Sequence, residues 1–250
     1  MVRVLIALLI AASPAHSEPY PWPRSGQYLR EPAVLVFSKT RDWRHESGIP
    51  AATLFVVETA EELGMGVHST EDGRIFNDAD LSRFSIVVMN NVTGAAIEAD
   101  EQKVLEKWIA AGGGVLAIHG AGDGSMTNWR WYLNTVIGAE FTGHPMGPQF
   151  QDAGVHVLSP GHPVTEGLPL QFIHNDEWYS FTAPPRGPFI PLLGLDESTY
   201  QQSGTVFGPP ERMVMGPTPS DHPVAWATCA GTGRIVYSAL GHRAQAYKAP

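Results

Sequence analysis

The sequence has a single cysteine, Cys229, and is short of basic residues. One cysteine cannot form an internal disulfide, so stability has to come from packing of the core. The surrounding apolar run "VAWATCAG" predicts that this thiol is buried and unreactive. With 16 Lys and Arg against 25 Asp and Glu, the formal net charge is −9. A protein with a negative net charge repels nucleic acids and anionic membranes. We therefore expect a small neutral molecule as the binding partner.

The N-terminal apolar run is too short to serve as a membrane anchor. It extends from Val4 to Ala12, whereas a bilayer-spanning helix needs about 20 apolar residues. The preceding Arg3 and the following Ala15-x-Ser17 complete a secretory signal pattern. We expect a signal peptide over residues 1–17 that is cleaved near Ser17/Glu18, and a periplasmic or secreted protein with no stable membrane anchor. Residues 18–32 form a Pro-rich lead, and a single domain is expected over residues 33–247.

Strands and helices are expected to alternate in the first half of the chain. The aliphatic runs "AVLVFSKT", "SIVVMNNVTG" and "VLAIHGAG" are typical of buried parallel strands. Between them, "IPAATLFVVETAEELGMG" and "EADEQKVLEKWIAAGGG" have helical spacing and end at glycine. From about Phe141 onward, strand-like runs alternate with loops rich in proline and glycine. The pattern predicts an α/β fold with a doubly wound, mostly parallel sheet flanked by helices, and a C-terminal half rich in strands and loops.

Polar residues follow the predicted strands, at the sheet edge where open α/β sheets bind their ligands. Three histidines belong to this group: His45 after the first strand, His119 after the third, and His242 after the last. Gly120 and Gly122 allow a tight turn at His119 and a close approach by a ligand. The same loops also contain Arg44, Asn91 and Thr93. We therefore expect three imidazoles to meet at one edge of the sheet.

A second polar group lies in the segment "HNDEWYSF". Adjacent residues of a strand point to opposite faces, so at most one of Asp176 and Glu177 is expected to face the site. Trp178 and Tyr179 have two interpretations: each ring either stacks on a sugar or belongs to the core. We favour the core for one of them and leave the other open.

An ordered set of segments resembles the ThuA-like, or trehalose-utilisation, family. The segments are "FSKTRDWRHES", "GGGVLAIHGAGD", "WRWYLNTVIGAEFTGHP", "HPVTEGLP", "NDEWYSF", "LDESTY", "DHPVAW" and "GRIVYSALGH". The resemblance implies a flavodoxin-like fold related to class I glutamine amidotransferases, whose strand-to-helix elbow has a cysteine where this chain has His119. Amidotransfer needs a thiolate, so we do not expect it here. The matching family positions include His45, His119, His144, Glu177, His222 and His242.

The resemblance also implies that the protein takes part in carbohydrate processing, with a sugar oxidoreductase of the same pathway as a partner. That partner would supply 3-keto derivatives of trehalose or of related glycosides. Our first hypothesis is acid–base catalysis by histidine. His119 is the expected base, His45 or His242 the acid or oxyanion stabiliser, and Glu177 orients an imidazole or holds sugar hydroxyls. The expected substrate-binding residues are Arg44, Asn91, Thr93, His144, Trp178, Tyr179 and His222.

Two alternatives remain open. In the first, His45, His119, His242 and Glu177 bind a zinc ion; no local ligand spacing indicates this, so the ligands would have to meet in the fold. No other cofactor is expected. In the second, the protein is a non-catalytic sugar-binding or accessory module for a partner dehydrogenase or a transporter. Its aromatic side chains, Trp43 among them, would then stack on the sugar.

Overall fold

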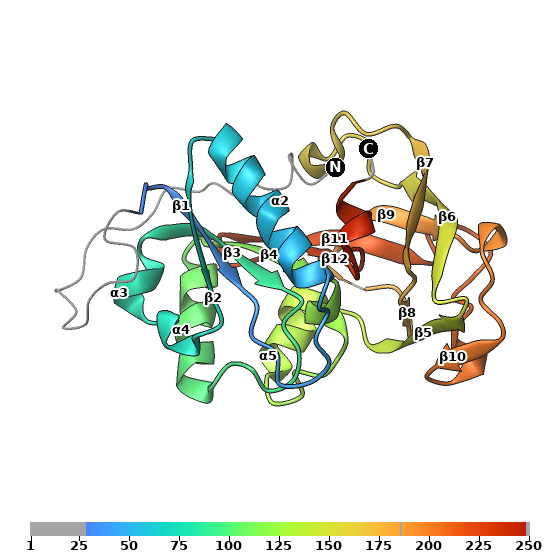
Figure 1. Ribbon diagram of the computed structural model, residues 1–250, viewed down its shortest axis with the longest axis horizontal. Helices are drawn as coiled ribbons and strands as arrows, with labels where there is room; N and C mark the ends of the chain where they lie inside the picture. The colour runs from blue at the N-terminus through green and yellow to red at the C-terminus, as the bar shows by residue number, and fades with distance from the viewer. Residues whose placement is uncertain (1–28, 186, 249–250) are drawn as a thin grey trace.

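The computed structural model describes residues 29–185 and 187–248. The predicted signal peptide and most of the Pro-rich lead lie outside these residues. Nine strands form one mixed sheet in the order β2-β1-β3-β4-β12-β11-β9-β6-β7, and β10, β5 and β8 form a smaller sheet. Figure 1 shows the helices gathered on the N-terminal half and the strand-rich C-terminal half beside it.

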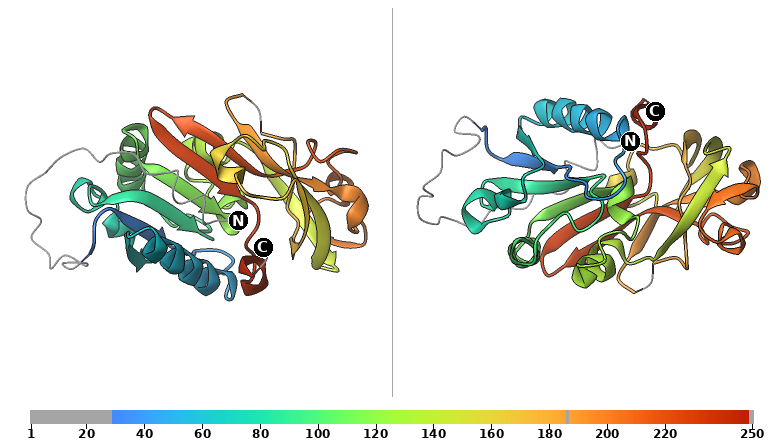
Figure 2. Two further views of the ribbon diagram at one scale, coloured as in Figure 1. Left: turned by 90° about the horizontal axis from the view of Figure 1, so that it is seen from above. Right: turned by 60° about the horizontal axis from the view of Figure 1, so that its bottom comes forward.

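The parallel half of the large sheet contains the predicted doubly wound arrangement. Its strands are β2 (Gly66–Thr70), β1 (Ala33–Phe37), β3 (Phe84–Asn90), β4 (Gly114–Ile118) and β12 (Gly233–Ser238). Its helices are α2 (Gly48–Glu62), α3 (Asp78–Leu81), α4 (Ala99–Ala110) and α5 (Arg130–Tyr132). Helix α2 covers one face of the sheet, and α4 and α5 cover the other (Figure 2). The flavodoxin-like fold expected from the sequence is confirmed for this half.

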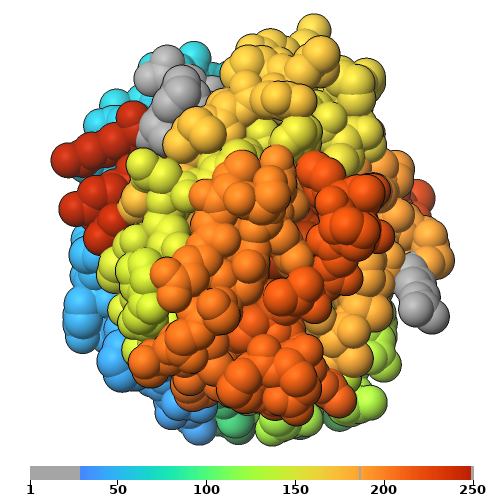
Figure 3. All heavy atoms as spheres, turned by 90° about the vertical axis from the view of Figure 1, so that its right-hand side faces the viewer, coloured from blue at the N-terminus to red at the C-terminus, as the bar shows by residue number. Residues whose placement is uncertain are grey.

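The other half of the large sheet is antiparallel. It contains β11 (Pro223–Ala230), β9 (Ile190–Asp196), β6 (Phe150–Val157) and β7 (Gln171–Glu177). The small sheet consists of β10 (Thr205–Phe207), β5 (Phe141–Gly147) and β8 (Ser180–Phe181). The loops on either side of β10, in orange, form much of the surface at this end of the molecule (Figure 3). Among the described residues, no helix is long and apolar enough to span a membrane.

Two features differ from the sequence-based expectations. Strand β2 was not predicted, because it is a short edge strand that pairs only with β1 and is partly exposed along its length. Cys229 was predicted to be buried but is exposed. The reason is that β9 covers β11 only as far as Ala227. Cys229 pairs with Arg234 at the start of β12, which is the end of the sheet opposite His119.

A buried hydrogen bond between His222 and Glu197 joins the loops of the antiparallel half. His222 Nδ1 lies 2.7 Å from Glu197 Oε1, and its Nε2 lies 2.8 Å from the Tyr179 carbonyl oxygen. Glu197 also accepts hydrogen bonds from the backbone N–H groups of Met215 and Gly216. Burial alone would raise the pKa of Glu197, but these hydrogen bonds outweigh it and hold the pKa below its usual 4.5. The ionised carboxylate is therefore stabilised by folding.

Replacing Glu197 by Gln is expected to lower the free energy of unfolding by about 1–3 kcal/mol at pH 7. Because the folded-state pKa is depressed, the contribution is complete above pH 4.5 and is lost as the pH falls through the folded-state value. Urea unfolding of both proteins between pH 3 and pH 7 measures this. Glu211→Gln in an exposed turn serves as the control. A difference that stays constant across this pH range would contradict the prediction.

Candidate active site and metal centre

The site forms at the edge of the sheet where the parallel strands end. His45 lies in the connection between β1 and α2, His119 directly follows β4, and His242 lies in the loop after β12. Glu177 is the last residue of β7. The three imidazoles therefore meet at one edge, as the order of the strands predicted.

Strong curling of the sheet brings Glu177 to these histidines. Strand β7 is four strands away from β12, and neighbouring strands lie about 4.8 Å apart, so a flat sheet would separate them by about 19 Å. The carboxylate of Glu177 nevertheless lies 2.9 Å from Nδ1 of His242. The antiparallel half must therefore bend back over the carboxyl ends of the parallel strands.

The four side chains form a compact, nearly closed cluster. Glu177 Oε2 lies 2.9 Å from His242 Nδ1 and 3.3 Å from His119 Nε2. The His119 Nε2 and His242 Nδ1 atoms are 3.1 Å apart. The ring of His45 stands edge-on to both other imidazoles, with centroid distances of 4.8 and 4.7 Å. His45, His119 and Glu177 are buried, and His242 keeps 14% of its side chain exposed.

Neighbouring groups fix the orientation of these side chains. His119 Nδ1 lies 2.6 Å from the Ala239 carbonyl oxygen, so this nitrogen carries a hydrogen and Nε2 is the nitrogen that faces the cluster. The other carboxylate oxygen of Glu177 accepts from Gln149 Nε2 at 2.6 Å and faces His144 Nδ1 at 3.1 Å. These contacts hold the imidazole nitrogens and the carboxylate oxygens of the cluster in one arrangement.

Asp176 acts on the backbone of the same loop. Its carboxylate accepts hydrogen bonds from the N–H groups of Gly241 and His242, at 2.6 and 3.2 Å. As predicted, only one of the two adjacent carboxylates, that of Glu177, enters the cluster. The other positions the loop that carries His242.

The electrostatic environment prepares the cluster for a cation. Burial, followed by the proximity of His119 and His242, lowers the pKa of His45 to about 2, so its ring is neutral at pH 7. Burial alone would raise the pKa of Glu177, but hydrogen bonds from His119 and His242 hold that pKa well below its usual range. Burial alone would lower the pKa of His119, but the adjacent Glu177 outweighs this effect and raises the pKa. The carboxylate is thus ionised next to a neutral His45.

The backbone at His119 adopts a conformation that is unusual for a residue with a side chain. Its φ is +45°, and Asn91 is the other described non-glycine residue with a positive φ. Such a conformation is strained, and it turns the imidazole into the site directly after β4. Gly120 then leaves room for His45, since a Cβ at this position would lie 2.8 Å from His45 Cε1 and 3.0 Å from its Nδ1.

The cluster has the composition of a divalent-metal site. One ligand atom from each of His45, His119, Glu177 and His242 lies within 4.8 Å of the others. Three imidazole nitrogens and one carboxylate oxygen are ligands that zinc accepts in tetrahedral geometry. In addition, His45 Nδ1 is buried and has no hydrogen-bond partner among the described residues. A metal ion would provide a partner for a ring that otherwise has an unsatisfied polar atom.

The other residues predicted to bind substrate occupy different environments. Arg44 pairs with Glu71 at 2.8 Å on the surface. Asn91 and Thr93 are buried and serve the local backbone: Asn91 accepts from the Gly120 N–H, and Thr93 donates to the Trp43 carbonyl. His222 is engaged with Glu197 and Tyr179. His144, by contrast, contacts the cluster directly through Glu177.

The two aromatic residues after Glu177 are both buried. Trp178 has no exposed surface, and its indole N–H donates to the Gln151 carbonyl, so this ring belongs to the core and is no platform for a sugar. Tyr179 is also buried, but its ring packs against His119 with a centroid distance of 4.1 Å. It therefore forms a wall of the cluster. Trp43, by contrast, is 67% exposed.

Sequence reasoning missed Gln149 and the positioning role of Asp176. Gln149 lies in the turn between β5 and β6, and a glutamine in a turn carries no signal of its function. Asp176 was noted only as a neighbour of Glu177, because its hydrogen bonds to the backbone of residues 241 and 242 depend on curling of the sheet.

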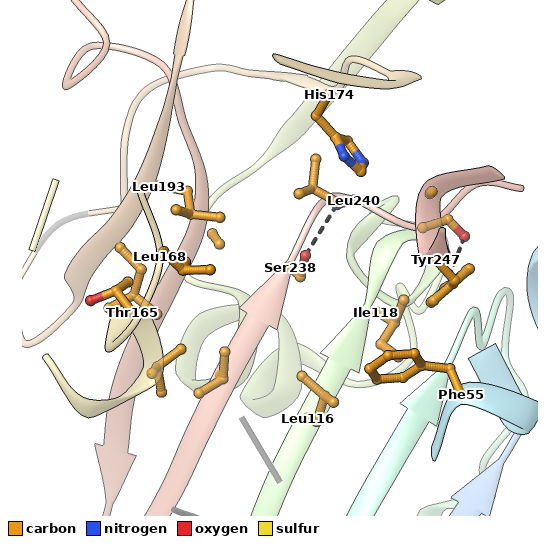
Figure 4. Close-up of a pocket in the computed structure, with 16 residues that line it drawn as sticks. Phe55, Leu116, Ile118, Thr165, Leu168, His174, Leu193, Ser238, Leu240 and Tyr247 are labelled. Atoms are coloured by element: carbon orange, nitrogen blue, oxygen red, sulfur yellow. Dashed lines mark hydrogen bonds between the residues drawn. The ribbon is translucent and has the colours of Figure 1, made fainter. Parts of the chain in front are cut away.

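An apolar cavity lies apart from the cluster, between α2, the ends of β4 and β12, and the antiparallel strands. Its labelled lining residues are mostly aliphatic or aromatic, with His174 pointing inward (Figure 4). Its volume of about 70 Å³ is well below the roughly 300 Å³ at which sites for small organic ligands begin. This cavity is too small to hold a disaccharide.

Fold and cluster together define an α/β protein with a flavodoxin-like parallel half, in which a histidine follows strand β4 directly. A family model described as "ThuA: Trehalose utilisation" matches residues 33–250. The chain therefore belongs to the ThuA family, and this membership connects it with trehalose utilisation. No curated protein matches the chain significantly.

Solved structures confirm the fold. A putative ThuA-like protein from Bacteroides uniformis is 23% identical, with a TM-score of 0.71 over 91% of this chain and 89% of its own. One from Parabacteroides merdae is 17% identical, with a TM-score of 0.60 over 84% and 79%. A β-galactosidase from Rahnella sp. R3 is 13% identical, with a TM-score of 0.53 over 88% of this chain and 30% of its own.

Replacing Gly120 by Ala is expected to lower the free energy of unfolding by about 1–3 kcal/mol, because the new methyl group collides with the buried His45 ring. Chemical denaturation measures the effect. Gly161→Ala is the matched control, since a Cβ there has no neighbour within 4 Å. Equal stability of the two variants would show that the His45 ring does not occupy this position.

Proposed function

We propose that this protein is a divalent-metal enzyme that processes an oxidised disaccharide or glycoside, such as a 3-keto derivative of trehalose. The observation that carries the proposal is the buried cluster of His45, His119, His242 and Glu177, whose ligand atoms lie within 4.8 Å of one another. Membership of the ThuA family supports the substrate class. A bound zinc-like ion would act as a Lewis acid on a sugar oxygen.

The geometry favours His119 as a ligand rather than as the catalytic base. The ring has no exposed surface, and its two nitrogens face Ala239 on one side and the cluster on the other. A base has to come within hydrogen-bond reach of the substrate proton. When a cation binds, His119 would release the hydrogen on Nε2 and contribute that lone pair as a ligand, and proton transfer would fall to a more accessible group.

His144 is the group that suits this task. Its Nδ1 lies 3.1 Å from both Glu177 Oε1 and the Pro145 carbonyl oxygen. Both neighbours are acceptors, so Nδ1 carries the hydrogen and Nε2 has the free lone pair. Burial lowers the pKa of His144, so the ring is neutral and basic at pH 7. Its side chain is 13% exposed, whereas that of His119 has no exposed surface, so His144 is the more accessible of the two imidazoles.

Elimination is the reaction that these groups support. A keto group acidifies the neighbouring C–H bond, and Nε2 of His144 takes up this proton. The C–H electron pair forms a C=C bond while the C–O bond to the leaving sugar breaks, and the departing oxygen takes up the proton from the His144 imidazolium, which regenerates the base. The reaction needs no thiolate, which agrees with the absence of a cysteine from the elbow.

We also propose that the chain is exported and acts on sugars outside the cytoplasm. The support is the sequence of residues 1–17, with Arg3, the apolar run that follows it, and the small residues before Glu18. A sugar oxidoreductase of the same pathway is the proposed partner, because a reaction of that class has to introduce the keto group.

Protein purified without a His-tag from zinc-supplemented medium is expected to contain about one metal ion per chain. His119→Ala and His242→Ala are expected to lose the ion, because each removes a ligand. His156→Ala, a partly exposed histidine on β6, serves as the control and should retain it. Elemental analysis by mass spectrometry gives the ratio. A metal-free wild type with an intact fold would overturn the metal centre.

Wild-type protein is expected to cleave 3-keto-trehalose and to leave trehalose intact, because only the keto sugar has an acidified C–H bond. Chelation should abolish the activity, and zinc should restore it. His144→Ala should lower kcat by about a hundredfold or more while the metal content stays unchanged. Product analysis by NMR follows the reaction. If the wild type binds either sugar without turnover, the protein is a binding module rather than an enzyme.

A further inference from the structure

Two partly exposed histidines, His242 of the cluster and the adjacent His144, indicate how a substrate reaches the site. His144 and His242 are 13% and 14% exposed, whereas the side chains of His119 and Glu177 are 0% and 1% exposed. Phe150 stands edge-on to His242 with a centroid distance of 5.0 Å. A ligand therefore approaches past His144 and His242, and the aromatic rings beside these two histidines border its path.

Phe207 is the exposed ring on this path. It lies directly opposite His144 in the antiparallel pair β5–β10, so both side chains share one face of the small sheet. The two rings stack at a centroid distance of 5.4 Å and an interplanar angle of 22°. Phe207 is nevertheless 58% exposed. This ring thus offers an apolar face to a ligand directly beside the polar cluster.

The backbone holds this ring in place. A Cβ on Gly143 would lie 1.9 Å from the Phe207 carbonyl oxygen, and a Cβ on Gly208 would lie 2.1 Å from the Thr142 carbonyl oxygen. Strands β5 and β10 can approach this closely only with glycine at both positions, and both glycines have positive φ. The two glycines therefore fix the backbone at Phe207, whose ring stacks on Phe141 and His144 and remains mostly exposed.

We propose that Phe207 is the platform for the second sugar ring of the substrate, the ring that leaves when the glycosidic bond breaks. The C–H face of a pyranose is apolar and stacks on the π-face of an aromatic ring. With the leaving ring on Phe207, the glycosidic bond lies over His144 and the oxidised ring extends toward Glu177 and the metal ligands. This inference rests on the proposed function, to which it adds the subsite that selects a disaccharide.

The test compares two substrates and two variants. The substrates are 3-keto-trehalose and methyl 3-keto-glucoside, which lacks the second ring. Phe207→Ala is expected to lower kcat/KM for 3-keto-trehalose about tenfold relative to kcat/KM for methyl 3-keto-glucoside. Phe207→Trp should restore the ratio, because it keeps an aromatic face. Leu54→Ala, which removes an exposed apolar side chain from α2, should leave the ratio unchanged.

Failure of this inference is distinguishable from failure of the proposed function. If the wild type cleaves both substrates and Phe207→Ala leaves their ratio unchanged, the function stands and the subsite is overturned. If the wild type cleaves neither, the proposed function fails, and the subsite is measured by calorimetry of trehalose binding. About tenfold weaker binding to Phe207→Ala than to wild type then supports the platform. Equal binding, or no binding to either protein, overturns it.

Discussion

The site depends on one buried carboxylate, that of Glu177. Removing such an ion from water costs several kcal/mol, and the protein offsets this cost with polar hydrogens from four side chains. One oxygen faces His119 and His242, and the other faces His144 and Gln149. These partners come from three segments of the chain, so the carboxylate is also the point at which both halves of the molecule meet.

The antiparallel half of the sheet has a direct consequence for the chemistry. A flavodoxin-like sheet alone would deliver the three histidines, but it would leave them without an anion and open to solvent. The added strands bend until β7 ends above β12, where Glu177 enters the cluster and Asp176 binds the backbone of Gly241 and His242. The antiparallel half therefore supplies the negative charge through Glu177 and closes the site through Asp176.

Local sequence signals predicted the parts of the site that depend on local structure. The strands before His119 and His242 were recognisable as aliphatic runs, and the topology of open α/β sheets then placed these residues at one edge. The ends of β7 and β10 could not be placed in this way, because their position follows from curling of the sheet. The pattern also placed Cys229 in the core, because an aliphatic strand does not indicate where its neighbouring strand ends.

The elbow after β4 explains why a histidine can replace a nucleophile there. A positive φ at this residue turns its side chain away from the strand and into the space above the sheet edge. For a thiol, this geometry would expose a nucleophile to a substrate. In this chain His119 is covered by the ring of Tyr179 and faces the other residues of the cluster, so the same strained turn directs its Nε2 into the cluster. In the proposed function a cation would occupy this position, with His144 further out as the base and Phe207 beyond it as the platform for the sugar.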